Sequence, residues 1–272
     1  MKIRMNLDVA AIAFRSIVFV IIFCLFIPIA VTIVVSFNKS GFVLPPSGLT
    51  LRWYSTALTY REFLTGMYVS LLVALISSGI ATILGTLASL ALVRYRFQGR
   101  DLINIFLMSP LMMPVVIVGL ALYSFLVRIG IVDSILTLIV GHCIFTMPFS
   151  IRTVSASLQN FDIALEEAAM NVGAGPLRTF FSITLPIIKT GIIAGMMMAF
   201  ILSWNNFALS IFLASPNWIP LPLQLFSYIK FEFDATAAAL SSFLIGLSAV
   251  AIVLIDRLIG LGVVMGLQNE KS

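Results

Sequence analysis

His142 is the only histidine of the chain, and it lies in the apolar segment GHCIFTMPFS. A histidine can serve as a general base, a proton shuttle or a metal ligand. Each role needs partners, and this segment offers no acidic residue and no other metal ligand at a suitable spacing. We therefore expect His142 to hydrogen-bond across helices, and we predict no catalytic residue and no metal site.

Two other features limit the chemistry of the chain. Cys24 and Cys143 both lie in apolar segments, where buried free thiols are expected. The sequence has no G-x-x-x-x-G-K-[ST] motif, so it does not bind ATP through a P-loop. If the protein does work across a membrane, another chain must supply the energy.

The elements that hold these residues are strongly apolar. Of the 272 residues, 61% are hydrophobic and 10% are charged, against about 25% charged in a soluble domain. A bilayer core about 30 Å thick needs about 20 apolar residues for each spanning helix. We predict an all-α integral membrane protein of one domain, 1–272, in which the first span is an uncleaved anchor. Six spans are expected, at about 16–38, 63–93, 102–127, 134–152, 190–214 and 235–256.

The basic residues predict the orientation of these spans. Six spans place both termini on one side, and eleven of the sixteen Lys and Arg fall on that side. The positive-inside rule makes that side cytoplasmic. The bias also accounts for the net charge of +5. The sequence has no basic run interleaved with aromatic residues, so nucleic-acid binding is disfavoured. The remaining five basic residues are Lys39, Arg52, Arg61, Arg128 and Lys230.

The interior of the spans is polar only through neutral groups. Apart from Arg152 and Asp256 at span ends, the spans contain no Lys, Arg, Asp or Glu. An ionisable residue inside the membrane is the usual mark of a proton relay or a catalytic centre. A proton-driven transporter and an intramembrane hydrolase are therefore disfavoured.

Two interrupted segments are candidates for lining a solute path. Pro110 and Pro114 break helical hydrogen bonds in MSPLMMPVVIVG, where a packing kink is the alternative explanation. The stretch SWNNFALS places amides in the fifth span, where interhelical packing is again the alternative. The predicted path residues are Ser109, Pro110, Pro114, Ser203, Trp204, Asn205 and Asn206.

The loop 153–189 carries more apolar residues than a solvated loop needs. FDIALEEAAMNV is rich in helix formers, with Asp162 placed to cap its start and Gly173 to end it. Pro176 suits the first turn of a second helix, which we expect to run to Leu185-Pro186. The loop is then a linker packed on its own spans, a helix-turn-helix, or a docking surface for a cytoplasmic protein. One arginine in the second helix and the flanking membrane spans disfavour the DNA-binding alternative.

The spacing of residues in this loop resembles the EAA loop of ABC importer permeases. The matching positions are Glu167, Ala168, Ala169, Gly173, Ile183, Leu185 and Pro186. The resemblance extends over essentially the whole chain and implies the type I importer permease fold, with a six-helix body. It implies that the loop docks on a separate ATP-binding subunit, that Glu167 contacts that subunit, and that Gly173 forms the turn.

The same resemblance implies an assembly in the bacterial cytoplasmic (inner) membrane. Two permeases, here two distinct chains, would act with two ATP-binding subunits and an extracytoplasmic substrate-binding protein. ATP and magnesium would bind the partner subunit, and this chain would need no cofactor. A channel, a receptor and a membrane enzyme remain alternatives, but none of them explains the EAA spacing.

Within this family, the chain resembles the second permease of spermidine/putrescine-type systems. The supporting stretches are LRWYSTAL, RYRFQG, MSPLMMP, HCIFTMPFSIRTVSASLQNFD and LPLQLFSYIK. Such permeases often carry acidic residues in the fifth span, where this chain has the neutral Asn205 and Asn206. The expected solute is a polyamine or a related amine or opine-like compound, with phosphonate, thiamine and ferric iron as alternatives.

Overall fold

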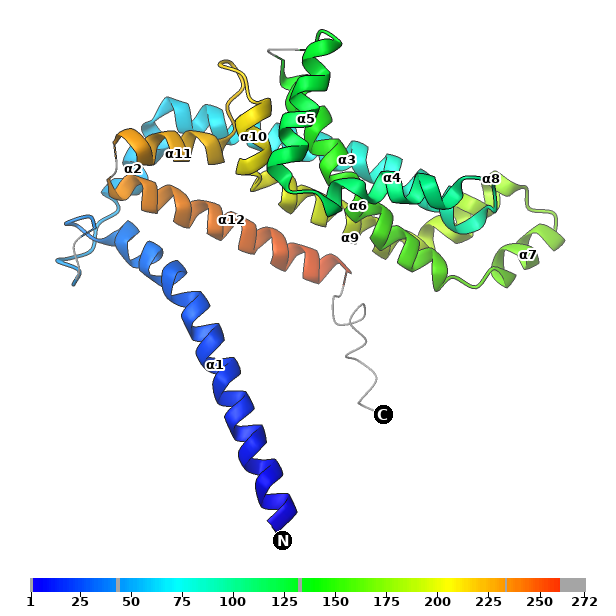
Figure 1. Ribbon diagram of the computed structural model, residues 1–272, viewed down its shortest axis with the longest axis horizontal. Helices are drawn as coiled ribbons and strands as arrows, with labels where there is room; N and C mark the ends of the chain where they lie inside the picture. Colours follow the sequence, from blue (N-terminus) through cyan, green and yellow to red (C-terminus); the bar gives the residue numbers. More distant parts are fainter. Residues whose placement is uncertain (1, 43–44, 132–133, 233, 260–272) are drawn as a thin grey trace. The chain divides into compact units, whose positions relative to one another are not determined.

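The computed structural model describes residues 2–42, 45–131, 134–232 and 234–259, which form helices joined by loops (Figure 1). The described residues contain no β-strand and only two isolated bridges, which confirms the all-α prediction. The helices are α1 Lys2–Phe37, α2 Arg52–Thr59, α3 Arg61–Arg94, α4 Arg100–Met112, α5 Val115–Arg128, α6 Ile135–Gln159, α7 Ala164–Asn171, α8 Pro176–Thr179, the π-helix η1 Phe180–Thr184, α9 Leu185–Trp204, α10 Phe207–Leu213, α11 Leu221–Phe231 and α12 Ala235–Ile259.

Four helical stretches of the described chain are long and apolar enough to cross a membrane. They are Phe14–Phe37, Arg61–Arg94, Ile135–Gln159 and Pro176–Trp204. The bent pair α4 and α5 raises the number to five if it counts as one span, and Ala235–Val250 is a shorter apolar helix. The membrane class is therefore supported, whereas the predicted count of six is not confirmed.

The predicted span 102–127 is not one straight helix. The chain bends by 113° between α4 and α5. Pro110 lies inside α4 without breaking it, because the Ser109 hydroxyl donates at 2.8 Å to the Phe106 carbonyl that proline leaves without its usual partner. The break comes at Met113, whose extended backbone is the conformation favoured before Pro114.

The predicted span 190–214 and the loop before it also need correction. The helix that starts at Pro176 does not end at Leu185-Pro186 but continues through η1 into α9. Pro186 has no N–H to donate, so it cannot form the usual helical hydrogen bond. The helix continues because a wider π-helical turn precedes the proline, and in this turn the Leu185 N–H donates to the Phe180 carbonyl. At the other end the helix stops at Trp204, and α10 begins separately at Phe207.

The described chain divides into two compact units, and each is considered by itself. The first comprises Met1–Arg61 and Leu225–Leu247. Its core joins Val35, Ala235 and Ala238 to Trp53, whose indole N–H donates to the Asn38 carbonyl at 2.9 Å. The apolar part of α1 is exposed, including Cys24, so the prediction that this thiol is buried is wrong.

The second unit comprises Glu62–Gln224 and Ser248–Ser272, and it contains the candidate sites. α6 and α9 lie side by side within it (Figure 1). Gly191 and Gly195 allow this close approach, since a Cβ on Gly191 would lie 2.1 Å from the Ser157 hydroxyl oxygen. A larger apolar cluster packs α3, α5, α6 and α10 together through Val73, Leu126, Leu138 and Leu209.

Candidate functional site

The segment after α6 forms a short helix, a glycine turn and a second helix, as the sequence predicts. Asp162 accepts a hydrogen bond from the Ala164 N–H at 3.0 Å and so caps the start of α7. The N–H of Gly173 donates to the Met170 carbonyl at 3.0 Å, and that of Ala174 to the Ala169 carbonyl at 3.1 Å. This pair of bonds is the Schellman motif, and it places Gly173 at a φ of +90°, which glycine adopts without strain.

Glu166 fixes α7 to the neighbouring helices. Its carboxylate accepts hydrogen bonds from Arg94, the last residue of α3, and from Thr184 in η1. Burial opposes ionisation of this carboxyl, but the bonds from Arg94 and Thr184 and the Arg94 charge together hold its pKa below the ordinary value. The Arg94 guanidinium also lies over the Phe161 ring, 5.0 Å from its centroid.

Glu167, in contrast, is exposed, and the described residues offer it no salt bridge. Ala168 is exposed beside it, and Ala169 is half-buried. Further along, Ile183 packs against the buried cluster around Val154 and Ile188, while Pro186 is exposed and Leu185 half-buried. Of the two adjacent acids, one therefore holds the loop together and the other is free to meet a partner.

The outer side of this loop is apolar. Val172, Leu177 and Phe181 are 86%, 76% and 62% exposed, and Leu165 and Met170 are also exposed. We call these five residues the α7–η1 surface. Figure 1 shows α7 and α8 beyond the ends of α6 and α9, away from the core of the unit. Exposed apolar side chains gathered on one loop are typical of a protein interaction site.

Four of the predicted path residues are consecutive in the chain, at 203–206, and they lie at the break between α9 and α10. Ser203 and Trp204 are buried at the end of α9. Asn206 caps α10 by accepting a hydrogen bond from the Leu209 N–H at 2.9 Å. Asn205 is exposed, and its amide lies 3.4 Å from both the Ile201 carbonyl and the Ser248 hydroxyl. Its side chain is thus exposed and held by two long hydrogen bonds.

His142 connects this break to α6 and α3. Its Nδ1 lies 2.8 Å from the Ser203 hydroxyl, and its Nε2 lies 3.3 Å from the Ser210 hydroxyl. Ser203 is in turn 3.1 Å from the Ser77 hydroxyl of α3. The histidine is 1% exposed and bridges the two sides of the break, which confirms that it hydrogen-bonds across helices. The described residues contain no group of three metal-ligating side chains.

The other three predicted path residues lie elsewhere in the unit. Ser109 and Pro110 are half-buried in α4, and Pro114 is exposed at the start of α5. No hydrogen bond of the described residues joins them to the α9–α10 break. Their proposed role in the path therefore has no geometric support beyond the bend that Pro114 creates.

Comparison with known proteins assigns the chain to a protein family. Residues 81–261 match the family model described as binding-protein-dependent transport system inner membrane component. The chain belongs to this family. The permease is 33% identical over 229 residues to the spermidine/putrescine transport system permease protein PotC of Escherichia coli K12, covering 84% of this chain and 87% of the relative. It is also 33% identical over 249 residues to the putrescine transport system permease protein PotI of the same strain, covering 89% of each.

A solved structure supports the same fold for the permease. A chain of a bacterial ABC transporter involved in the import of alginate aligns with a TM-score of 0.68 at 15% identity, covering 93% of this chain and 96% of that one. The ABC importer permease fold expected from the sequence is thus confirmed. The family is one of transport components, so the channel, receptor and membrane-enzyme alternatives lose their support.

Two sets of contacts in this unit are not predicted from the sequence. The contacts that need Gly191 and Gly195 follow the spacing G-x-x-x-G, which is a known signal for close helix packing in membranes. The bond from Arg94 to Glu166 joins residues far apart in the chain, and no local pattern indicates it. In the sequence, only the residue types of Arg94 and Glu166, a base and an acid, could have suggested this pair.

Proposed function

We propose that this permease imports a polyamine with the aid of a separate ATP-binding subunit. The solute is inferred from the names of its relatives, PotC and PotI, which favour a polyamine over phosphonate, thiamine or ferric iron. Asn205 carries the solute contact in this proposal. Its exposed amide can accept hydrogen bonds from the ammonium groups of a polyamine without the carboxylates often found at this place.

The coupling site is the α7–η1 surface together with Glu167. The observation that carries this assignment is the opposite placement of the two acids, since Glu166 is bonded inward and Glu167 is exposed. The surface offers apolar side chains for a groove on the ATP-binding subunit, and Glu167 offers a carboxylate to a basic residue there. Ala168, Ala169 and Gly173 let the helix and its turn lie close to that partner.

The remaining parts of the assembly follow from this role. The loop and both termini lie on the cytoplasmic side of the inner membrane, the side to which most basic residues fall. A second, distinct permease, two ATP-binding subunits and an extracytoplasmic binding protein complete the importer. ATP and magnesium bind the partner, and this chain holds no cofactor.

The coupling role is tested by co-purification. A tagged chain is purified from its native membranes in detergent, as wild type, as Glu167→Arg and as Glu62→Arg. Glu62 is an exposed acid at the start of α3, so Glu62→Arg makes the same charge change away from the loop. We expect an ATPase with a P-loop to accompany the wild type and Glu62→Arg and to be lost from Glu167→Arg. Recovery of no ATPase with the wild type would refute the coupling proposal.

The solute is tested by uptake. Cells that express the importer are given radiolabelled putrescine or spermidine, and we compare wild type with Asn205→Leu. We expect uptake to fall in the variant while the ATPase still co-purifies with it. Unchanged uptake would remove Asn205 from the path, and absence of polyamine uptake by the wild type would refute the solute assignment.

A further inference from the structure

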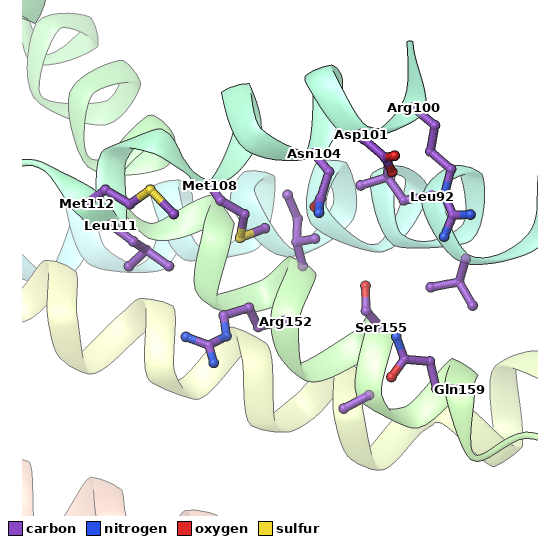
Figure 2. A pocket seen from close by; sticks show the side chains of 13 residues that line it. Leu92, Arg100, Asp101, Asn104, Met108, Leu111, Met112, Arg152, Ser155 and Gln159 are labelled. Atoms are coloured by element: carbon purple, nitrogen blue, oxygen red, sulfur yellow. The ribbon is translucent and has the colours of Figure 1, made fainter. Parts of the chain in front are cut away.

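The polar side chains of α6 lie in two different surroundings. Toward α4, Arg152, Ser155 and Gln159 line a cavity of about 580 Å³ (Figure 2). Arg152 and Gln159 are exposed, so water can serve as their hydrogen-bond partner. His142 lies nearer the start of α6 and is buried, as are both of its hydrogen-bond partners. Buried polar groups pair within the protein, so the donor and the acceptor of each bond to His142 follow from the groups around it.

The Ser210 hydroxyl determines which nitrogen of His142 carries a proton. Its Oγ lies 2.6 Å from the Asn206 carbonyl, which can only accept, so the single hydroxyl proton points to that carbonyl. The contact of 3.3 Å between this Oγ and Nε2 of His142 is then a hydrogen bond only if Nε2 carries a proton. His142 forms no ion pair within the part of the chain that the structure describes, and an unpaired buried charge is costly. The imidazole is therefore neutral, and its other nitrogen, Nδ1, is an acceptor.

The bonds on the Nδ1 side follow from this assignment. Nδ1 lies 2.8 Å from the Ser203 Oγ, so the Ser203 hydroxyl donates to it. The Ser203 Oγ then accepts from the Ser77 hydroxyl of α3, which lies 3.1 Å away. The hydrogen bonds form one chain with a single direction, from Ser77 through Ser203, His142 and Ser210 to the Asn206 carbonyl.

This hydrogen-bonded chain holds the backbone on both sides of Asn205. Ser203 lies two residues before Asn205, at the end of α9, and Asn206 follows it directly, before α10 begins. The imidazole bonds to the first flank through Nδ1, and it reaches the second through Nε2 and the Ser210 hydroxyl. One side chain of α6 therefore restrains both ends of the break that carries the proposed solute contact.

We propose that His142, as the tautomer protonated at Nε2, is the positioning residue of the solute contact. The buried imidazole does not touch the solute. It holds Asn205 in place by fixing Ser203 and the Asn206 carbonyl from its two ring nitrogens. The positioning role rests on the proposed function, in which Asn205 meets the solute, whereas the tautomer and the hydrogen-bonded chain do not depend on it.

The tautomer is tested by nuclear magnetic resonance of the full chain in lipid bilayers. The protein is labelled with ¹⁵N at histidine and carries a tag without histidine, so the spectrum shows one imidazole, that of His142. We expect a bonded proton on Nε2 and none on Nδ1. The Nε2 signal should shift in Ser210→Ala and stay unchanged in the control Ser150→Ala. Ser150 is also buried in the unit and also hydrogen-bonded at 3.3 Å, to Thr82, but it lies further along α6.

Three results of this experiment would overturn the proposal. They are a proton on Nδ1 alone, protons on both nitrogens of the wild type, and a spectrum of Ser210→Ala identical to that of the wild type. None of them depends on the identity of the solute or on the ATP-binding subunit.

The positioning role is tested by the kinetics of putrescine uptake in cells that express the importer. Ser210→Ala should raise KM about fivefold, as expected for the loss of one hydrogen bond, with little change in the maximal rate. Ser150→Ala should leave both unchanged. In an Asn205→Leu background, Ser210→Ala should have no further effect on KM, because the side chain that it positions is gone.

The outcomes separate this role from the proposed function. A lower maximal rate with an unchanged KM in Ser210→Ala, or the same rise in KM in the Asn205→Leu background, would overturn the positioning role. Wild-type uptake by Asn205→Leu would instead refute the solute contact, and the spectrum of His142 would still decide whether the hydrogen-bonded chain has the proposed direction.

Discussion

The ion pair of Glu166 and Arg94 should control how firmly α7 is attached to the rest of its unit. The two side chains are only 12% and 20% exposed, so solvent screens the pair less than it would a surface salt bridge. A charge-assisted hydrogen bond contributes about 1.5–3 kcal/mol, and we take the lower part of this range for a partly exposed pair. Glu166→Gln should therefore lower the free energy for opening α7 by about 2 kcal/mol.

Hydrogen exchange of the α7 amides measures this loss directly. A change of about 2 kcal/mol corresponds to exchange about 30-fold faster at residues 168–171, with little change in the amides of α6. A double-mutant cycle with Arg94→Gln isolates the pair, and its coupling energy should be about 1–2 kcal/mol. Additive effects of the two substitutions, or faster exchange throughout the chain, would refute the assignment of Glu166 as the anchor.

The same pair predicts a dependence on pH. The folded pKa of Glu166 is held below its ordinary value of 4.5, so the unfolded chain binds this proton more readily. The stability that the carboxylate contributes is therefore fully present at neutral pH. It is lost as the pH falls from 4.5 through the lower folded pKa. Glu166→Gln should remove this part of the acid sensitivity of α7 exchange, and an unchanged pH profile would contradict it.

Three further predictions concern packing and backbone. Gly191→Ala should destabilise the permease by about 1–3 kcal/mol through overpacking against α6, whereas Gly79→Ala, which has open space around its Cβ, should be neutral or stabilising in the same thermal unfolding assay. Gly173→Ala should lower the unfolding free energy by about 1 kcal/mol because Gly173 has a positive φ, and Gly173→Asn should lower it less. Both variants should also take up the solute more slowly if the turn shapes the α7–η1 surface. His142→Ala removes the hydrogen bonds from the imidazole to the Ser203 and Ser210 hydroxyls, which keep Ser77 and the Asn206 carbonyl as partners. At about 0.5–1.5 kcal/mol for each lost bond, the unfolding free energy should fall by about 1–3 kcal/mol, and a stability equal to that of the wild type would refute the bridging role of His142.

The local features of the coupling loop were predictable because each depends on residues close in the chain. Asp162, Gly173 and Pro176 mark a helix start, a helix end and a second start by their own backbone chemistry. The length and apolar character of α3 and α6 likewise follow from runs of residues in the sequence. Hydropathy alone predicts such helices because the bilayer sets their length.

The breaks and the long-range contacts were less predictable because they depend on competing local effects. The sequence indicated two prolines at which the third span might break, and the structure breaks at Pro114 but not at Pro110, where a neighbouring serine satisfies the carbonyl. Leu185-Pro186 resembles a helix end in the sequence, yet the helix continues past the proline through the π-helical turn η1. The opposite placement of Glu166 and Glu167 depends on Arg94 and Thr184, which no pattern within the loop indicates.

The unbroken helix from Pro176 to Trp204 has a mechanical consequence. Its 29 residues span about 43 Å at 1.5 Å per residue, more than the hydrocarbon thickness of about 30 Å. One end carries Leu177 of the α7–η1 surface, and the other stops next to Asn205, the proposed solute contact. If the helix moves as a rigid body, a tilt of about 10° around its middle moves each end by about 4 Å. A push delivered by a partner at one side of the membrane would then reach the solute at the other as a rotation of a single rod, without a relay of side chains between them.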